Sequence, residues 1–131
     1  MDKQTVLVVD DAPENIDLLV GLLKDNFTVK AARNGAVALK ITQSSTPPNL
    51  VLLDIVMPGM DGFEVCRELK ANPATAAIPV IFLSGEIGEA ERKRGAELGA
   101  VDYLTKPVDP NQLLAAIESI VFKKRGGEYG Y

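Results

Sequence analysis

The sequence predicts an α/β fold in which helices cover both faces of one parallel sheet. Apolar runs alternate with amphipathic segments five times along the 131-residue chain. Two of these runs, residues 50–53 (LVLL) and 79–83 (PVIFL), have no apolar–polar alternation, which is typical of strands buried on both faces. Five β–α units with right-handed crossovers predict a single doubly wound, five-stranded parallel sheet with five helices on its two faces.

The first half of the chain is expected to supply three strands and two helices. The strands are residues 5–9 (TVLVV), the less apolar and more peripheral residues 27–32 (FTVKAA), and residues 50–53. The first helix covers about residues 13–24, because apolar side chains recur there at helical spacing, at Ile16, Leu19, Val20 and Leu23. A second, short helix begins at Asn34-Gly35, and the polar loop SSTPPN leads to the central strand.

The second half is expected to supply three helices and two strands. The strands are residues 79–83 and 101–104 (VDYL), and the helices are residues 63–71, the polar segment 86–98 and a last helix after Asp109. Asp109 is an acidic cap with Pro110 in the first turn and Gln112 three residues on, which is a typical helix start. Residues 1–125 are therefore expected to form one domain, and residues 126–131 a flexible tail or linker stub.

Composition excludes several functional classes. Hydrophobic residues make up 47% of the chain and charged residues 24%, as in soluble globular proteins. A net charge of −4 argues against direct binding to nucleic acid or to an anionic membrane. No apolar run approaches the ~18 residues of a membrane span, and one cysteine fits a cytoplasmic location. Without histidine, the chain has no His base, His-ligated zinc or phosphohistidine.

Polar residues follow the strands that are expected to be central. They are Asp10 and Asp11, Asp54, Ser84 and Lys106. In a parallel sheet these strand ends share one edge, which is where open α/β sheets bind ligands. Two like charges about 4 Å apart repel by roughly 4 kcal/mol at an effective dielectric near 20, so three carboxylates there require a cation. Oxygen ligands alone favour Mg²⁺, and with Lys106 the group is suited to holding a phosphoryl group.

The segments VVDD, LLDIVMPGMDG, IFLSG and DYLTKP, taken together at this spacing, resemble the receiver domain of bacterial two-component response regulators. The resemblance extends from about residue 5 to residue 122. It implies a flavodoxin-like sheet with strand order 2-1-3-4-5. It also implies a signalling domain, not an enzyme that turns over external substrates. The piece LGAVDYLTKP further resembles receivers attached to cyclic-dinucleotide enzymes.

The resemblance assigns roles by position. Asp54 would be the phosphoacceptor, a carboxylate nucleophile that forms an acyl phosphate. Asp11 and Asp54 would bind Mg²⁺ directly and Asp10 through water, with the backbone carbonyl of Val56 as a further ligand. Lys106 would pair with a phosphoryl oxygen.

Further positions match the residues that, in this family, change conformation on phosphorylation and those that surround the phosphorylation site. The Ser84 hydroxyl would move onto the phosphoryl group, and Tyr103 matches an aromatic residue that then turns inward. Val56 and Glu86 stand where rim side chains control hydrolysis, and the Lys106–Pro107 bond matches one that is usually cis. The responsive surface would be the polar helix 86–98, the strand with Tyr103 and the last helix.

The resemblance also implies partners. The domain would receive its phosphoryl group from a sensor histidine kinase or a histidine phosphotransfer protein, and would act on a downstream output domain or protein.

Other interpretations use the same residues. An aspartate-nucleophile phosphatase would share the fold and Mg²⁺ but would need a second Asp where Val56 stands. A flavin- or nucleotide-binding domain would need a phosphate loop after the first strand, where DDAPEN offers carboxylates. A receiver-like scaffold that is never phosphorylated would normally lack part of the acidic set. Taken alone, Asp11 would be a helix cap and Lys106 a surface charge.

Overall fold

A computed structural model describes residues 3–85 and 88–122 of the chain. Five strands form one parallel sheet in the order β2-β1-β3-β4-β5, which confirms the expected topology. The strands are β1 (Thr5–Val9), β2 (Thr28–Ala32), β3 (Leu50–Asp54), β4 (Val80–Ser84) and β5 (Asp102–Thr105). The central strand β3 is buried along its whole length, as its continuous apolar run predicts.

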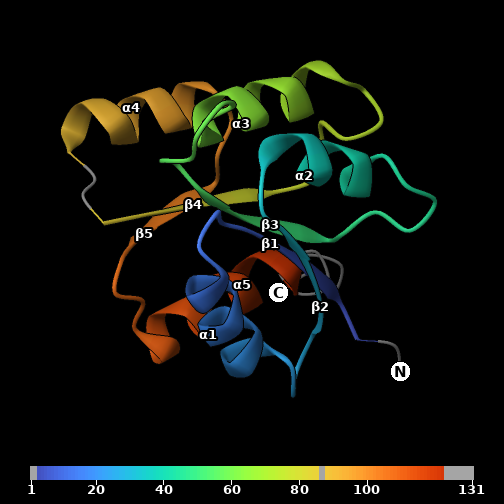
Figure 1. Ribbon diagram of the computed structural model, residues 1–131, viewed down its shortest axis with the longest axis vertical. Helices are drawn as coiled ribbons and strands as arrows, with labels where there is room; N and C mark the ends of the chain where they lie inside the picture. The colour runs from blue at the N-terminus through green and yellow to red at the C-terminus, as the bar shows by residue number, and fades with distance from the viewer. Residues whose placement is uncertain (1–2, 86–87, 123–131) are drawn as a thin grey trace, which may run out of the picture.

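Helices cover both faces of the sheet. They are α1 (Pro13–Leu23), α2 (Gly35–Thr42), α3 (Gly62–Ala71), α4 (Glu89–Glu97) and α5 (Pro110–Val121). Helices α2, α3 and α4 lie on one face, and α1 and α5 lie on the other (Figure 1). None of these described helices has the length and hydropathy needed to cross a membrane.

Two apolar cores follow from this layering. One lies between the sheet and α3, where Phe63 packs edge to face on Phe82 of β4. The other lies between the sheet and helices α1 and α5, and includes Leu19 and Leu113. Cys66 is fully buried in the first core, where it packs as a small apolar residue, in keeping with its position on an apolar helix face. Both cores fix the strands, and therefore the positions of the polar residues that follow them.

Element ends differ from the prediction by one to three residues. Phe27 was expected in β2, but its backbone N–H donates to the Leu23 carbonyl and its ring is buried, so it belongs to the turn after α1. The polar helix expected over residues 86–98 begins at Glu89, and residues 86–87 lie outside the described residues. The Glu91 carboxylate accepts the Gly88 N–H at 2.9 Å, which defines this start.

Helix caps also test the sequence interpretation. Asp11 does not cap α1, because the cap position is Ala12, whose own side chain makes no capping hydrogen bond. Asp61 and Glu64 form a reciprocal capping box at α3. Asp109 caps α5, but it accepts the N–H of Asn111 and not that of Gln112. Because Asp11 does not cap α1, its carboxylate can join the other acids at the edge of the sheet.

Helix α3 approaches the end of β3 closely at Gly62. The Gly62 N–H donates to the Ile55 carbonyl at 2.8 Å. A Cβ atom at Gly62 would collide with the backbone carbonyl of Asp54 and with the Ile55 Cα. Gly62 is therefore required where the chain passes over the last residue of the central strand.

Candidate functional site

The carboxyl ends of the central strands bring the predicted polar residues together. Asp54 is the last residue of β3 and Ser84 the last of β4, while Asp10 and Lys106 follow β1 and β5. One carboxylate oxygen each from Asp10, Asp11 and Asp54 lies within 4.8 Å of the others. The expected acidic cluster is therefore present, although its members are up to 44 residues apart in sequence (10 to 54).

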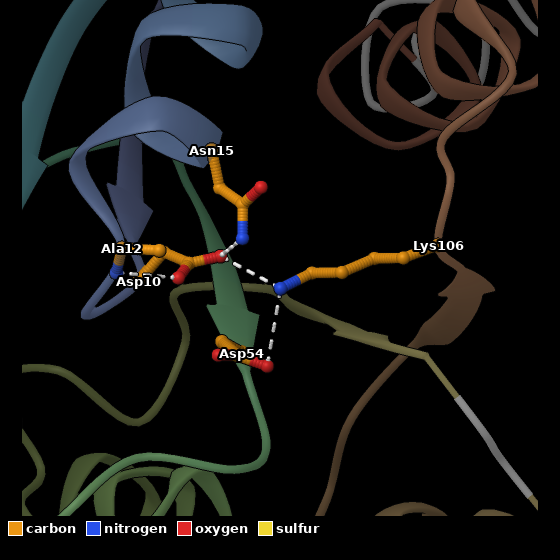
Figure 2. A network of polar contacts seen from close by, with 5 residues as sticks. All are labelled: Asp10, Ala12, Asn15, Asp54 and Lys106. Carbon is orange, nitrogen blue, oxygen red and sulfur yellow. Dashed lines mark hydrogen bonds and ion pairs between the residues drawn. The ribbon is translucent and has the colours of Figure 1, made fainter.

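Lys106 bridges two of these carboxylates (Figure 2). Its Nζ lies 2.7 Å from Asp10 Oδ2 and 3.4 Å from Asp54 Oδ1. The Lys106 side chain is 21% exposed, against 1% for Asp10 and 8% for Asp54. A charged lysine thus partly neutralises two buried acids, as buried charges require.

Asp10 has two further donors, both at the start of α1. The Ala12 backbone N–H donates to Asp10 Oδ1 at 3.0 Å. The Asn15 Nδ2 donates to Asp10 Oδ2 at 3.2 Å, as Figure 2 shows. The sequence interpretation missed Asn15. The available signal was a polar amide in the first turn of the helix that follows the Asp10-Asp11 pair.

Burial raises the pKa of the Asp54 carboxyl above its ordinary value. The Lys106 charge opposes this shift, while the neighbouring charge of Asp10 adds to it. Hydrogen bonds from Lys106 and from the Val56 backbone favour the ionised form and lower the pKa in part. The site therefore holds an acid whose negative charge is incompletely compensated by the chain itself.

An open cleft of about 660 Å³ lies between the segment that follows Asp54 and the end of β4. It is lined by Ile55, Val56, Ser84, Gly85, Gly88 and Glu91. The Val56 side chain is 72% exposed, and Ser84 is buried at 4%. The expected rim residue Val56 therefore lies at the mouth of the cleft, whereas Glu86, the other expected rim residue, is outside the described residues.

Tyr103 lies on the edge strand β5 and is 36% exposed. The Arg92 guanidinium carbon of α4 lies 4.3 Å from the centre of its ring. Both residues line a cavity of about 120 Å³ beneath α4. The Lys106–Pro107 peptide bond is cis, as the family resemblance implies.

The donor set fits a hard divalent cation. The three clustered side chains offer oxygen atoms only, and Mg²⁺ binds through one or two carboxylates while retaining several waters. Softer metals prefer sulfur or imidazole, and the chain contains no histidine. The one cysteine of the chain, Cys66, is buried in the core beneath α3. The acidic cluster is thus a candidate Mg²⁺ site.

Fold and site together define a phospho-accepting receiver domain. The family model for the response regulator receiver domain matches residues 6–118, so the chain belongs to this family of two-component signalling domains. This match confirms the resemblance drawn from the sequence motifs. Because the family consists of signalling domains, membership favours the receiver interpretation over a phosphatase or a nucleotide-binding domain.

Individual relatives agree with the family. The chain is 47% identical over 125 residues to a probable cyclic di-GMP phosphodiesterase of Vibrio cholerae, covering 95% of this chain and 28% of that protein. It is 39% identical to protein PilH of Pseudomonas aeruginosa, covering 88% of this chain and 96% of PilH. The crystal structure of a putative response regulator from Chloroflexus aurantiacus superposes with a TM-score of 0.86 at 29% sequence identity. The match covers 92% of this chain and 98% of that chain. The chain thus spans about a quarter of the length of the Vibrio relative.

Proposed function

We propose that Asp54 is the residue that accepts the phosphoryl group. The single observation that carries this proposal is the position of its carboxylate. It ends the central strand, within reach of the Lys106 ammonium and beside two further acids. An Asp54 oxygen would attack phosphorus while the phosphorus–nitrogen bond of a phosphohistidine donor breaks. The electron pair of that bond leaves with the imidazole, and an acyl phosphate forms.

Asp10, Asp11, Asp54 and the backbone carbonyl of Val56 are proposed to hold Mg²⁺, with Asp10 acting through water. When bound, the ion would neutralise the charge of the acids and of the transferring phosphoryl oxygens. The raised pKa of Asp54 supports this assignment, because the chain alone leaves the carboxylate under-compensated. Lys106 would turn from Asp10 toward a phosphoryl oxygen.

Ser84 and Tyr103 are proposed to report the phosphoryl group to the surface. Ser84 ends β4, the strand next to Asp54, and its hydroxyl would move onto a phosphoryl oxygen. Tyr103 pairs in register with Phe82, two residues earlier on β4. The 120 Å³ cavity beside Tyr103 supports an inward movement of its ring. Helix α4 would shift with it, because within the described residues only Gly95 of this helix is buried.

The proposed partners follow from the family. The donor would be a sensor histidine kinase or a histidine phosphotransfer protein, and the receiver would act on a downstream output domain or protein in the cytoplasm. The domain would catalyse only its own phosphoryl transfer and slow hydrolysis. Val56 and Glu86 would modulate that hydrolysis as rim residues.

Intact mass spectrometry tests the proposal. Incubation with Mg²⁺ and a small acyl phosphate should add roughly 80 Da, the mass of one phosphoryl group. Asp54→Asn should show no adduct, and omission of Mg²⁺ should reduce the yield in the unmodified sequence. The matched control is Asp25→Asn, an exposed acid beyond the end of α1, which should retain the full yield. A full-yield adduct on Asp54→Asn would refute the assignment.

A further inference from the structure

We propose that Asn15 is a positioning residue that holds the Asp10 carboxylate in place for Mg²⁺ and keeps it there when Lys106 moves away. The inference rests on the proposed function, because it takes Asp10 as part of the Mg²⁺ site. Asn15 itself touches neither the ion nor the phosphoryl group in this scheme. Its effect passes through Asp10.

The geometry around Asp10 carries the argument (Figure 2). Its Oδ1 accepts the Ala12 N–H at 3.0 Å, and its Oδ2 accepts both Lys106 Nζ at 2.7 Å and Asn15 Nδ2 at 3.2 Å. The three donors come from the β1–α1 loop, from the segment after β5 and from the first turn of α1. Donors on both oxygens, from the start of α1 and from Lys106, restrict the rotation of the carboxylate.

Lys106 alone is not a permanent partner for Asp10. The same ammonium lies 3.4 Å from Asp54 Oδ1, and the proposed reaction places it on a phosphoryl oxygen attached there. When it turns, Asp10 Oδ2 would lose its charged donor, although the Asp10 side chain is only 1% exposed in this structure. A buried carboxylate oxygen that is left without a donor destabilises the state that contains it. Asn15 supplies the donor to Oδ2 that does not depend on the state of Lys106.

The position of Asn15 is set by helix α1. The Asn15 backbone N–H donates to the Ala12 carbonyl at 3.1 Å, so the side chain and the Ala12 N–H belong to one tight turn. That turn therefore presents two donors to Asp10 as a unit. Asn15 is half-buried, so its amide is shielded in part from competing water. An aspartate here would have the same shape but would repel Asp10.

Calorimetric titration of the unphosphorylated chain with Mg²⁺ tests the inference. Loss of such an outer-shell partner typically weakens metal binding by 10–100-fold, so Asn15→Ala should raise the Mg²⁺ dissociation constant about tenfold. Asn15→Gln, which retains an amide donor on a longer arm, should bind Mg²⁺ more tightly than Asn15→Ala. Glu14→Gln is the matched control, because Glu14 is an exposed residue of the same turn, and its affinity should change by less than about twofold.

Thermal unfolding without and with Mg²⁺ separates positioning from a structural role. Asn15→Ala should unfold within a few degrees of the unmodified sequence without Mg²⁺, and should gain less stability when Mg²⁺ is added. Unchanged Mg²⁺ affinity in Asn15→Ala would overturn the inference. An equal loss of Mg²⁺ affinity in Glu14→Gln would also overturn it. So would an Asn15→Gln variant that binds Mg²⁺ no more tightly than Asn15→Ala does. Failure of the unmodified sequence to bind Mg²⁺ would instead contradict the proposed function itself.

Discussion

The guanidinium of Arg92 lies over the ring of Tyr103, with its carbon 4.3 Å from the ring centre. The contact joins α4 to the edge strand β5 across the small cavity beneath the helix. A cation over an aromatic face contributes about 0.5–1 kcal/mol at an exposed site. This contact therefore favours the outward position of Tyr103, the position opposite to the one proposed for the phosphorylated form.

Removal of this contact should ease the movement of Tyr103. Arg92→Ala should raise the inward population of the ring by a factor of about 2–5, the equivalent of 0.5–1 kcal/mol. Fluorotyrosine NMR measures this population, because the chain has three tyrosines and so gives few signals. Lys93→Ala, an exposed neighbour on α4, is the control and should leave the Tyr103 signal unchanged. An unaltered spectrum in Arg92→Ala would show that the ring is held outward by other contacts.

Asp54→Asn should stabilise the fold at neutral pH without Mg²⁺. The folded-state pKa of Asp54 is raised, chiefly by burial, so protonated Asp54 favours folding. That stability is fully present below the unfolded pKa and is lost as pH rises through the folded pKa. The neutral amide avoids the loss, so the advantage of the variant should appear as pH rises through this window. An increase in melting temperature of a few degrees is expected. Melting curves at several pH values check this, and a variant less stable than the unmodified sequence at pH 7 would refute it.

Gly62→Ala should destabilise the domain and disturb Asp54. The new methyl group would collide with the Asp54 carbonyl, and overpacking of this kind typically costs about 1–3 kcal/mol. Gly21→Ala is the matched control, because no atom lies within 4 Å of its added Cβ and Gly21 is inside α1. That change should stabilise by roughly 0.5–1 kcal/mol. Denaturant unfolding of both variants measures the change in the free energy of unfolding. Equal changes in the two variants would rule out the close approach of α3 to Asp54 at Gly62.

Val56→Asn should shorten the lifetime of the acyl phosphate severalfold. Hydrolysis needs a water in line with the bond from Asp54 to phosphorus. The exposed Val56 side chain, two residues after Asp54, lines the cleft but cannot form a hydrogen bond with water. An amide can orient the water, and a tenfold change needs only about 1.4 kcal/mol. The decay rate after removal of the donor is the measurement, with Val37→Asn, an exposed valine on α2, as control. A rate that is unchanged or slower would contradict the rim role of Val56.

The sheet and its polar edge could be predicted because local sequence determines them. Continuous apolar runs such as LVLL predict buried strands, and parallel strands bring their ends to one edge whatever the sequence distance between them. The strand order and the cis Lys106–Pro107 bond came from family resemblance. Neither follows from composition or spacing.

The remaining features depend on distances between elements, which periodicity does not encode. Phe27 is in a turn because its N–H donates to the Leu23 carbonyl. Strand β4 begins at Val80 because Pro79 has no N–H to donate to a neighbouring strand. The bond from Asn15 to Asp10 requires the exact angle at which α1 leaves the sheet. The Arg92–Tyr103 contact likewise requires the packing of α4 on the β5 edge.

The position of the phosphoryl group is the central claim, and chemical trapping tests it most directly. Borohydride reduces an acyl phosphate to an alcohol, so phosphorylated Asp54 would become homoserine. Tandem mass spectrometry of the peptides then locates the altered residue without any substitution that could affect folding. We predict homoserine at position 54, dependent on both Mg²⁺ and the acyl phosphate donor. Homoserine at position 10 or 11, or at none of the three acids in a chain that gains the phosphoryl mass, would contradict the account.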